Sequence, residues 1–273
     1  MASIVPLLQL DACHVDVWLA HYAEIGDTDL LGAMRQLLSV AEQAQEARFV
    51  RADDRQRYLV TRAMVRSVLS RYASVAPGDW LFVHNAHGRP RIAEAVRDSI
   101  DIRVQVNGLD FNISHTRGMI VMAVSRDRTV GIDVENTRRQ RDGLDIATQY
   151  FSPSEAADLA ALDAAQRQDR FTQYWTLKEA YSKARGLGLS LPLDQFSFDF
   201  IGADRVRFST APSLGDAAAS WRFWQLRPSN EHILALCAQQ CHGADTLLTV
   251  RTVTPLLSEE TITLPLLVRS FSA

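Results

Sequence analysis

The order of apolar and polar residues along the chain predicts several short strands and a few longer helices. Alternation with a period of two, which is typical of half-buried strands, begins at residues 15–22. Helical spacing follows through residues 30–47 and 48–72, where apolar side chains recur on one face. Residues 96–107 have a mixed, charged pattern that we interpret as irregular structure. The other predicted strands are 80–83, one near 91, 109–113, 119–124, 130–135, 195–200, 221–226, 232–238 and 247–253.

The strands at 109–113, 119–124 and 130–135 are predicted to pair consecutively as an antiparallel unit, with tight turns between them. Helices follow. The segment Ser152–Pro153–Ser154–Glu155 has the form of a capping box, which begins a helix. A further helix at 169–185 ends at Gly186, a residue type that commonly follows the last helical turn. A long helix followed by strands therefore occurs twice, which predicts a duplicated fold.

Composition narrows the function classes. The chain has 273 residues, of which 47% are hydrophobic and 22% charged, as in an ordinary globular protein. Its net charge of -3 argues against broad nucleic-acid binding, which usually needs a basic surface. No apolar run approaches the roughly 20 residues of a membrane helix, and residues 1–10 lack the positive region of a signal peptide. We therefore expect a cytoplasmic protein that binds neither nucleic acid nor membrane.

The three cysteines, Cys13, Cys237 and Cys241, are too sparse to predict a disulfide framework, and such usage fits a reducing compartment. Cys237, Cys241 and His242 do not predict a zinc site because no second pair completes four ligands.

The predicted strand 130–135 carries two acidic residues that are two positions apart. Residues two apart in a strand point to the same face, so Asp133 and Glu135 share one side while Ile132 and Val134 can pack into a core. Adjacent carboxylates repel each other unless a cation lies between them. A hard divalent ion such as Mg²⁺ prefers oxygen ligands and is the natural candidate. A solvent-facing strand edge is the simpler alternative.

A second group of polar residues lies on the predicted helix 169–185. Residues four apart share a helix face, which puts Trp175, Glu179 and Lys183 on one stripe. With the strand acids, Glu179 offers a third carboxylate to one Mg²⁺. Positive charge and hydrogen bonds for phosphates can come from other residues, namely Ser114, His115, Lys183 and Arg89. Metal, cations and donors together indicate a Mg²⁺-dependent enzyme that acts on a pyrophosphate compound.

These motifs, in this order, resemble those of the Sfp-type 4′-phosphopantetheinyl transferases. The similarity runs from about Arg48 to Phe200 and includes an arginine-rich helix through Arg62 and Arg66. The pair D-x-E and W-x-x-K-E-x-x-x-K is the specific part. The matching stretches are Gly88–Arg89–Pro90, Phe111–Asn112–Ile113–Ser114–His115, Gly131–Ile132–Asp133–Val134–Glu135, Phe151–Ser152–Pro153–Ser154–Glu155 and Trp175–Thr176–Leu177–Lys178–Glu179–Ala180 with Lys183 and Gly186.

The resemblance implies an α+β fold of two similar subdomains related by a pseudo-two-fold axis within one monomer. Each subdomain would be a small, mostly antiparallel sheet packed with a long helix. We expect residues 1–108 to form the coenzyme A side and residues 109–273 to carry the metal and catalytic motifs. The implied reaction moves the 4′-phosphopantetheine arm of coenzyme A to a Ser hydroxyl of an acyl or peptidyl carrier protein and releases adenosine 3′,5′-bisphosphate. The carrier would serve fatty acid, polyketide, nonribosomal peptide or lysine biosynthesis.

Roles follow from the matching positions. The resemblance implies that Asp133, Glu135 and Glu179 bind Mg²⁺, with Glu179 also matching a residue often proposed as the base. Lys183 would meet the pyrophosphate. The expected catalytic set is Glu179, Lys183, Asp133 and His115, and the expected coenzyme A contacts are Arg89, Asn112, Ser114, His115 and Lys183, with Arg48 and His87 as compensating contacts for the 3′-phosphate.

Several positions depart from the pattern or stay open. Glu42 and Gln45 stand where relatives often carry Lys or Arg, and Arg89 stands where Lys is common. Glu155 is either a helix cap or a catalytic acid. Carrier proteins are generally acidic, so the basic run Arg138, Arg139 and Arg141 is either a docking patch or a solvated loop. A non-catalytic coenzyme A-binding or carrier-binding homologue and a metal-dependent pyrophosphate hydrolase are the alternative functions.

Overall fold

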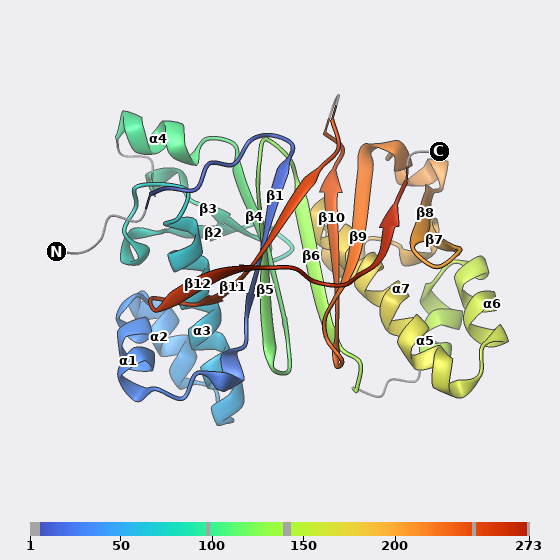
Figure 1. Cartoon of the computed structure of the whole chain (residues 1–273), viewed down its shortest axis with the longest axis horizontal. Helices are drawn as coiled ribbons and strands as arrows, with labels where there is room; N and C mark the ends of the chain where they lie inside the picture. Colours follow the sequence, from blue (N-terminus) through green and yellow to red (C-terminus); the bar gives the residue numbers. More distant parts are fainter. Residues whose placement is uncertain (1–5, 97–98, 139–142, 242–243, 272–273) are drawn as a thin grey trace.

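Two β-sheets lie side by side through the middle of the molecule, with helices on their outer sides (Figure 1). The computed structural model describes residues 6–96, 99–138, 143–241 and 244–271. One long helix packs on each sheet: α3 (Ala52–Leu69) belongs to the first and α7 (Ala164–Arg185) to the second. The predicted α+β fold of two sheet-and-helix halves is confirmed.

The first sheet contains both early and late parts of the chain. Its strand order is β12-β11-β1-β5-β4, and every pair is antiparallel except β1 with β11. Its strands are β1 (His14–Ala20), β4 (Leu109–Thr116), β5 (Met119–Arg126), β11 (Leu247–Thr254) and β12 (Ser258–Ile262). Around it lie α1 (Thr28–Gln36), α2 (Val40–Ala47), α4 (Ile100–Val106) and the small hairpin of β2 (Phe82–His84) and β3 (Pro90–Ile92).

The second sheet has the order β6-β10-β9-β13-β8-β7. One face packs on α7 and on two shorter helices through an aromatic core that includes Phe171, Phe198 and Phe223. The strands are β6 (Val130–Asn136), β7 (Phe196–Ile201), β8 (Arg205–Thr210), β9 (Trp221–Ser229), β10 (His232–Gln239) and β13 (Leu266–Ser270), and the helices are α5 (Gly143–Tyr150) and α6 (Pro153–Ala161).

A third apolar core joins the two sheets. Val17 of β1 and Val121 of β5 pack in the same cluster as Ile132 and Val134 of β6. Ile132 and Val134 are fully or almost fully buried, so the apolar side of the acid-bearing strand packs into a core as predicted. The two sheets are therefore held at one fixed junction, and the boundary between them runs along β4 and β6. The division at residues 108 and 109 stays a prediction.

The structure corrects several expectations. The strand β6 does not pair with β5 as the third member of an antiparallel unit; it begins the second sheet and pairs with β10. The segment interpreted as irregular contains α4, which Ser99 caps by accepting a hydrogen bond from the Ile102 N–H. The helix predicted at 30–47 is two helices, because Ser39 and Glu42 form a capping box that begins α2.

The expectation that the cysteines are reduced is also wrong for two of them. Cys13 and Cys241, which are 228 residues apart, form a disulfide, and Cys237 is a buried free thiol. Sequence spacing gave no sign of this pair because the two residues meet only where β11 joins β1. His242 lies outside the described residues. No helix in the described part of the chain is long and apolar enough to cross a membrane.

Candidate active site

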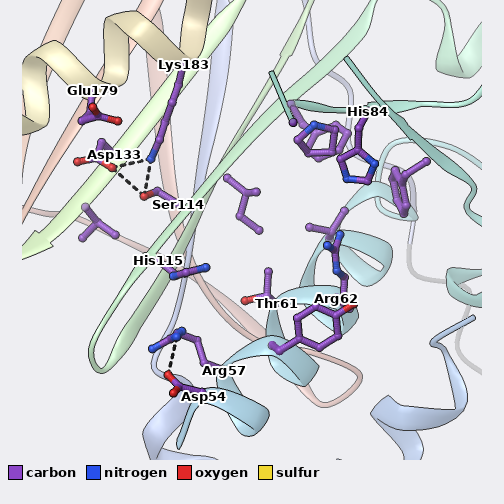
Figure 2. Close-up of a pocket in the computed structure, with 18 of the residues that line it drawn as sticks. Asp54, Arg57, Thr61, Arg62, His84, Ser114, His115, Asp133, Glu179 and Lys183 are labelled. Carbon is purple, nitrogen blue, oxygen red and sulfur yellow. Dashed lines mark hydrogen bonds and ion pairs between the residues drawn. The ribbon is translucent and has the colours of Figure 1, made fainter. Parts of the chain in front are cut away.

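A pocket of about 660 Å³ opens between the two halves (Figure 2). Strands β4 and β6 form its floor, α7 forms one wall and α3 the opposite one. Its polar lining residues are Asp54, Arg57, Tyr58, Thr61, Arg62, His84, Ser114, His115, Asp133, Glu135, Glu179 and Lys183. The pocket therefore brings together both acids of the predicted strand, the predicted helix stripe and the Ser–His pair of β4.

Ser114, Asp133 and Lys183 are in direct contact at the pocket floor (Figure 2). The Lys183 ammonium lies 2.6 Å from Asp133 Oδ1 and 2.8 Å from Ser114 Oγ. The Ser114 hydroxyl donates to the same carboxylate oxygen at 2.8 Å. Charge-assisted bonds of this length are strong. Three separate elements, β4, β6 and α7, are thus connected through one buried carboxylate.

A glycine allows α7 to approach this strand closely. A Cβ atom at Gly131 would collide with the backbone of α7 at Ala180 and Ala184. These two residues directly follow Glu179 and Lys183, which therefore reach the floor of the pocket. Helix α7 ends at Gly186 in the left-handed conformation, with a φ of 66°, as the sequence predicts.

The carboxylates around this contact differ in their surroundings. Asp133 is 4% exposed, and among the described residues its Oδ2 has no hydrogen-bond partner. Glu135 and Glu179 line the same pocket, and Figure 2 shows Glu179 beside Asp133. No group of three metal-binding side chains is close enough to form a ready-made metal cage in the part of the chain that is described. The acids share a pocket, but they do not enclose a common point.

His115 faces the pocket from β4, next to Ser114 (Figure 2). Desolvation in the pocket lowers the pKa of His115 below its ordinary value, and the positive charges of Arg57 and Lys183 lower it further. The imidazole is therefore neutral near pH 7 in the free protein. A ligand that brings negative charge to this wall would raise the pKa of His115.

The α3 wall supplies residues that sequence reasoning largely missed. Asp54, Arg57, Tyr58, Thr61 and Arg62 all line the pocket. Their spacing of three or four residues was a usable signal, because such residues share one helix face. The charged residues of this helix face did not reveal that it lines a pocket, because a solvent-exposed helix face has a similar composition.

Two protein-family models match successive parts of the chain. Residues 129–237 match a model of the 4′-phosphopantetheinyl transferase superfamily, and residues 27–127 match one described as 4′-phosphopantetheinyl transferase, N-terminal. The 4′-phosphopantetheinyl transferase HetI of Nostoc sp. is 32% identical over 199 residues, covering 73% of this chain and 77% of the relative. The chain belongs to the 4′-phosphopantetheinyl transferase family. The resemblance seen in the motifs is confirmed, and the protein is an enzyme of this class.

Other relatives agree. The transferase Sfp of Bacillus subtilis is 35% identical over 150 residues, which are 55% of this chain and 61% of the relative. A phosphopantetheinyl transferase of Thraustochytrium sp. is 25% identical over 244 residues, covering 85% of this chain and 80% of the relative. The similarity to the latter therefore extends well beyond the segment that carries the motifs.

Arg89 of the transferase lies beneath the pocket, outside its lining. The side chain is 6% exposed and its guanidinium group donates to the carbonyls of Lys183, Ala184 and Val130 at 2.6, 2.8 and 2.9 Å. It also pairs with Asp110 at 2.7 Å. Arg89 therefore joins the last turn of α7 to β4 and β6, where a cation also complements the helix dipole. The contact of Arg89 with coenzyme A stays a prediction.

Ser114, His115 and Lys183 line the pocket as predicted, whereas the predicted coenzyme A contacts Asn112, Arg48 and His87 lie outside its lining. Asn112 is 4% exposed, and its Oδ1 accepts a hydrogen bond from the Ile132 N–H. Arg48 and His87 are exposed at the end of α2 and in the β2–β3 loop, whereas His84 lines the pocket. Glu42, which departs from the family pattern, is held by Arg66 at 2.6 Å and forms the capping box of α2.

Glu155 acts structurally in this fold. It forms the predicted capping box with Ser152 at the start of α6. Its other contacts are a 2.8 Å ion pair with Lys178, both side chains fully buried, and a hydrogen bond from the Phe198 N–H. In the basic run, Arg138 is 76% exposed and pairs with Glu231, while Arg139 and Arg141 lie outside the described residues.

Proposed function

We propose that this transferase moves the 4′-phosphopantetheine arm of coenzyme A to a Ser hydroxyl of an acyl or peptidyl carrier protein. Adenosine 3′,5′-bisphosphate is the second product, and the reaction depends on Mg²⁺. The observation that carries the proposal is the contact of Lys183, Ser114 and Asp133 in a pocket that also holds Glu179 and His115. Cations, a hydroxyl donor and carboxylates are the groups that pyrophosphate chemistry requires.

The donor set fits Mg²⁺. Asp133, Glu135 and Glu179 offer hard oxygen ligands from one pocket, and Asp133 Oδ2 is buried without a hydrogen-bond partner among the described residues. Lys183 now neutralises part of this negative charge. Mg²⁺ usually takes one or two protein carboxylates and completes its shell with water and phosphate oxygens, so a full protein cage is unnecessary. When bound, the ion would neutralise charge on the pyrophosphate.

The chain's own residues account for the other parts of the reaction. The Lys183 side chain is 26% exposed at the pocket floor. Its ammonium group can stabilise the negative charge that develops on the departing phosphate. Ser114 and His115 offer hydrogen bonds to phosphate oxygens from β4. The Ser hydroxyl of the carrier protein attacks the phosphorus next to pantetheine and forms a P–O bond. The bond from this phosphorus to the bridging oxygen of the pyrophosphate breaks, and adenosine 3′,5′-bisphosphate leaves with that oxygen. The Ser proton passes to Glu179 or to a water beside it.

The opposite wall fits the nucleotide end of coenzyme A. Arg57 and Arg62 of α3 supply positive charge for phosphate groups, and both line the pocket. The enzyme would act as a monomer, because both walls of the pocket come from one chain. The cytoplasm stays the expected compartment on the sequence argument alone. The carrier protein would approach the open mouth, with Arg138 as one basic contact for an acidic surface.

The test is the mass of a purified apo carrier protein after incubation with the enzyme, coenzyme A and Mg²⁺. The proposal expects a gain of one phosphopantetheine group on Ser, and Asp133→Ala or Glu179→Ala should abolish it. A metal chelator should stop the reaction and excess Mg²⁺ should restore it. If both variants keep full activity, the proposed site is wrong. Cleavage of coenzyme A without a carrier would instead identify a pyrophosphate hydrolase, and binding without any reaction a non-catalytic homologue.

A further inference from the structure

Strands β4 and β6 belong to different sheets, yet a regular series of hydrogen bonds joins them. The acceptors are side chains of β4 and the donors are backbone N–H groups of β6. Asp110 Oδ2 accepts from Val130 at 3.4 Å, Asn112 Oδ1 from Ile132 at 2.9 Å, and Thr116 Oγ1 from Asn136 at 3.3 Å. The donor lies 20 residues after the acceptor in every case.

Strand geometry explains this regularity. Alternate residues of a strand direct their side chains to one face, so positions 110, 112, 114 and 116 all point the same way. One edge of β6 is paired with β10, and N–H groups of alternate residues are directed to the other edge. Side chains of β4 thus supply acceptors that a neighbouring strand's carbonyl groups would otherwise supply. We call this series the side-chain ladder.

The catalytic pocket interrupts the ladder at one position. The same spacing would match Ser114 to Val134, but the Ser114 hydroxyl instead contacts Asp133 and Lys183. The neighbouring rungs at Asn112 and Thr116 lie on either side of this contact. They fix how far β6 can slide or rotate against β4. Two hydrogen bonds that lie outside the pocket lining therefore flank the contact between Ser114 and Asp133.

We propose that Asn112 and Thr116 are positioning residues that hold the Ser114–Asp133–Lys183 contact in its reactive geometry. This inference rests on the proposed function and adds a role for two residues that touch no reacting atom. Asn112 is 4% exposed and Thr116 is 9% exposed, and neither lines the pocket. A buried amide and a buried hydroxyl in these positions act through the strands that they join.

The first test separates positioning from ligand contact. Asn112→Leu removes the acceptor at similar size, whereas Asn112→Asp retains an acceptor oxygen. For Asn112→Leu we expect kcat for carrier modification to fall by about tenfold or more, because small displacements of reacting groups have large effects on rate. The dissociation constant of coenzyme A, measured by calorimetry, should stay within about twofold. Asn112→Asp should recover most of kcat. A coenzyme A affinity that falls as much as kcat, or an unchanged kcat, would overturn the proposal.

A double variant tests whether Asn112 acts through Ser114. If it does, adding Asn112→Leu to Ser114→Ala should lower kcat little further, since the contact being positioned is already lost. Multiplicative losses would assign Asn112 an effect independent of Ser114 and contradict the inference. Should Asn112→Leu fail to fold, Thr116→Val and Thr116→Ser form the replacement pair, with kcat lowered only by Thr116→Val, which removes the acceptor.

One readout is independent of activity. Hydrogen exchange at the Ile132 amide should be slow in the wild type and faster in Asn112→Leu, while the Ile233 amide of β10 stays protected. Equal exchange at Ile132 in both proteins would refute the ladder itself. Failure of the wild type to modify any carrier, with the exchange difference intact, would count against the proposed function and leave the rung at Asn112 supported.

Discussion

Two lysines on α7 form ion pairs of the same chemical type, five residues apart, in contrasting surroundings. Lys178 pairs with Glu155 at 2.8 Å, and both side chains are 0% exposed. Lys183 pairs with Asp133 at 2.6 Å, but its side chain is 26% exposed at the floor of the pocket. The first pair is sealed inside the second half of the molecule, whereas the second can meet a ligand.

Buried protein groups surround the ammonium group of Lys178. Its ammonium donates to the carbonyls of Leu193 and Phe196 and lies over the rings of Phe151 and Phe196. Burial lowers the pKa of Lys178, and the Glu155 carboxylate opposes that effect. Glu155 is likewise committed to Ser152 and to the Phe198 N–H. The pair links α6, α7 and β7 and has no access to the pocket.

The contrast shows that one motif can combine two kinds of lysine. Residues 178 and 183 do not share a helix face, so one enters the core while the other enters the pocket. Residue type and proximity in sequence do not separate these roles, whereas the exposure of the lysine side chain does. The contrast can be tested by making the same substitution at both positions.

The largest effect on stability is expected from Lys178→Met. Removing the lysine leaves the Glu155 carboxylate buried without its cation, so the free energy of unfolding should fall by about 3–5 kcal/mol. Chemical denaturation monitored by circular dichroism measures this change. Lys183→Met is the matched control on the same helix, and we expect a smaller loss of about 1–3 kcal/mol, because Asp133 keeps the Ser114 hydrogen bond and borders the pocket. Equal losses from the two substitutions would remove the distinction.

The order reverses for activity. Lys183→Met should lower kcat for carrier modification by about a hundredfold, equivalent to about 2.7 kcal/mol of transition-state stabilisation. The reason is the loss of the ammonium group from the pocket floor, where charge develops on the departing phosphate. Steady-state rates with an apo carrier protein provide the measurement. A variant that keeps more than half of the wild-type kcat would show that Lys183 only balances the charge of Asp133.

Local patterns predicted much of this site because its chemistry follows strand and helix periodicity. Asp133 and Glu135 share a strand face, and Trp175, Glu179 and Lys183 share a helix face, and all of them line the pocket. The end of α7 at Gly186 and the capping box at Ser152 were likewise visible in local sequence. In each case the deciding interaction lies within a few residues along the chain.

What sequence could not predict depends on contacts between distant segments. Arg89 lies in a motif that suggests phosphate binding, but it is surrounded by the carbonyls that end α7 and by Asp110. The strand β6 follows β5 closely, yet it pairs with β10, about a hundred residues later in the chain. The Cys13–Cys241 disulfide depends on the same long-range return of β11. These contacts depend on how distant segments of the chain come together, which the spacing of apolar and polar residues does not predict.

Gly131→Ala should affect both lysine pairs, because this glycine lies against α7 at Ala180 and Ala184, close to both lysines. The added methyl group would meet Ala180 and Ala184, so α7 must move away from β6. We expect unfolding to become easier by about 1–3 kcal/mol, with a lower kcat in the folded enzyme. The control is Gly32→Ala in α1, where nothing lies within 4 Å of the added atom. Wild-type kcat and stability in Gly131→Ala would show that close packing of α7 is dispensable.

The smallest expected effect is the pH dependence of ligand affinity at His115. The pKa of this imidazole is lowered in the free protein by desolvation in the pocket and by Arg57 and Lys183, and phosphate groups would raise it. Binding then takes up a proton, so coenzyme A affinity should rise a few-fold between about pH 7 and pH 5.5. Stability of the free protein should change in the opposite sense, because the unfolded chain binds more protons below about pH 6.5.

Calorimetry at several pH values measures this effect for the wild type and for His115→Gln, in which the added affinity at low pH should be lost. His87→Gln is the matched control, because His87 is exposed and outside the pocket lining. A pH dependence that persists in His115→Gln would assign the proton to the ligand phosphates. Loss of the effect in His115→Gln alone would place the pocket's pH response on β4, beside the contact of Asp133 with Lys183.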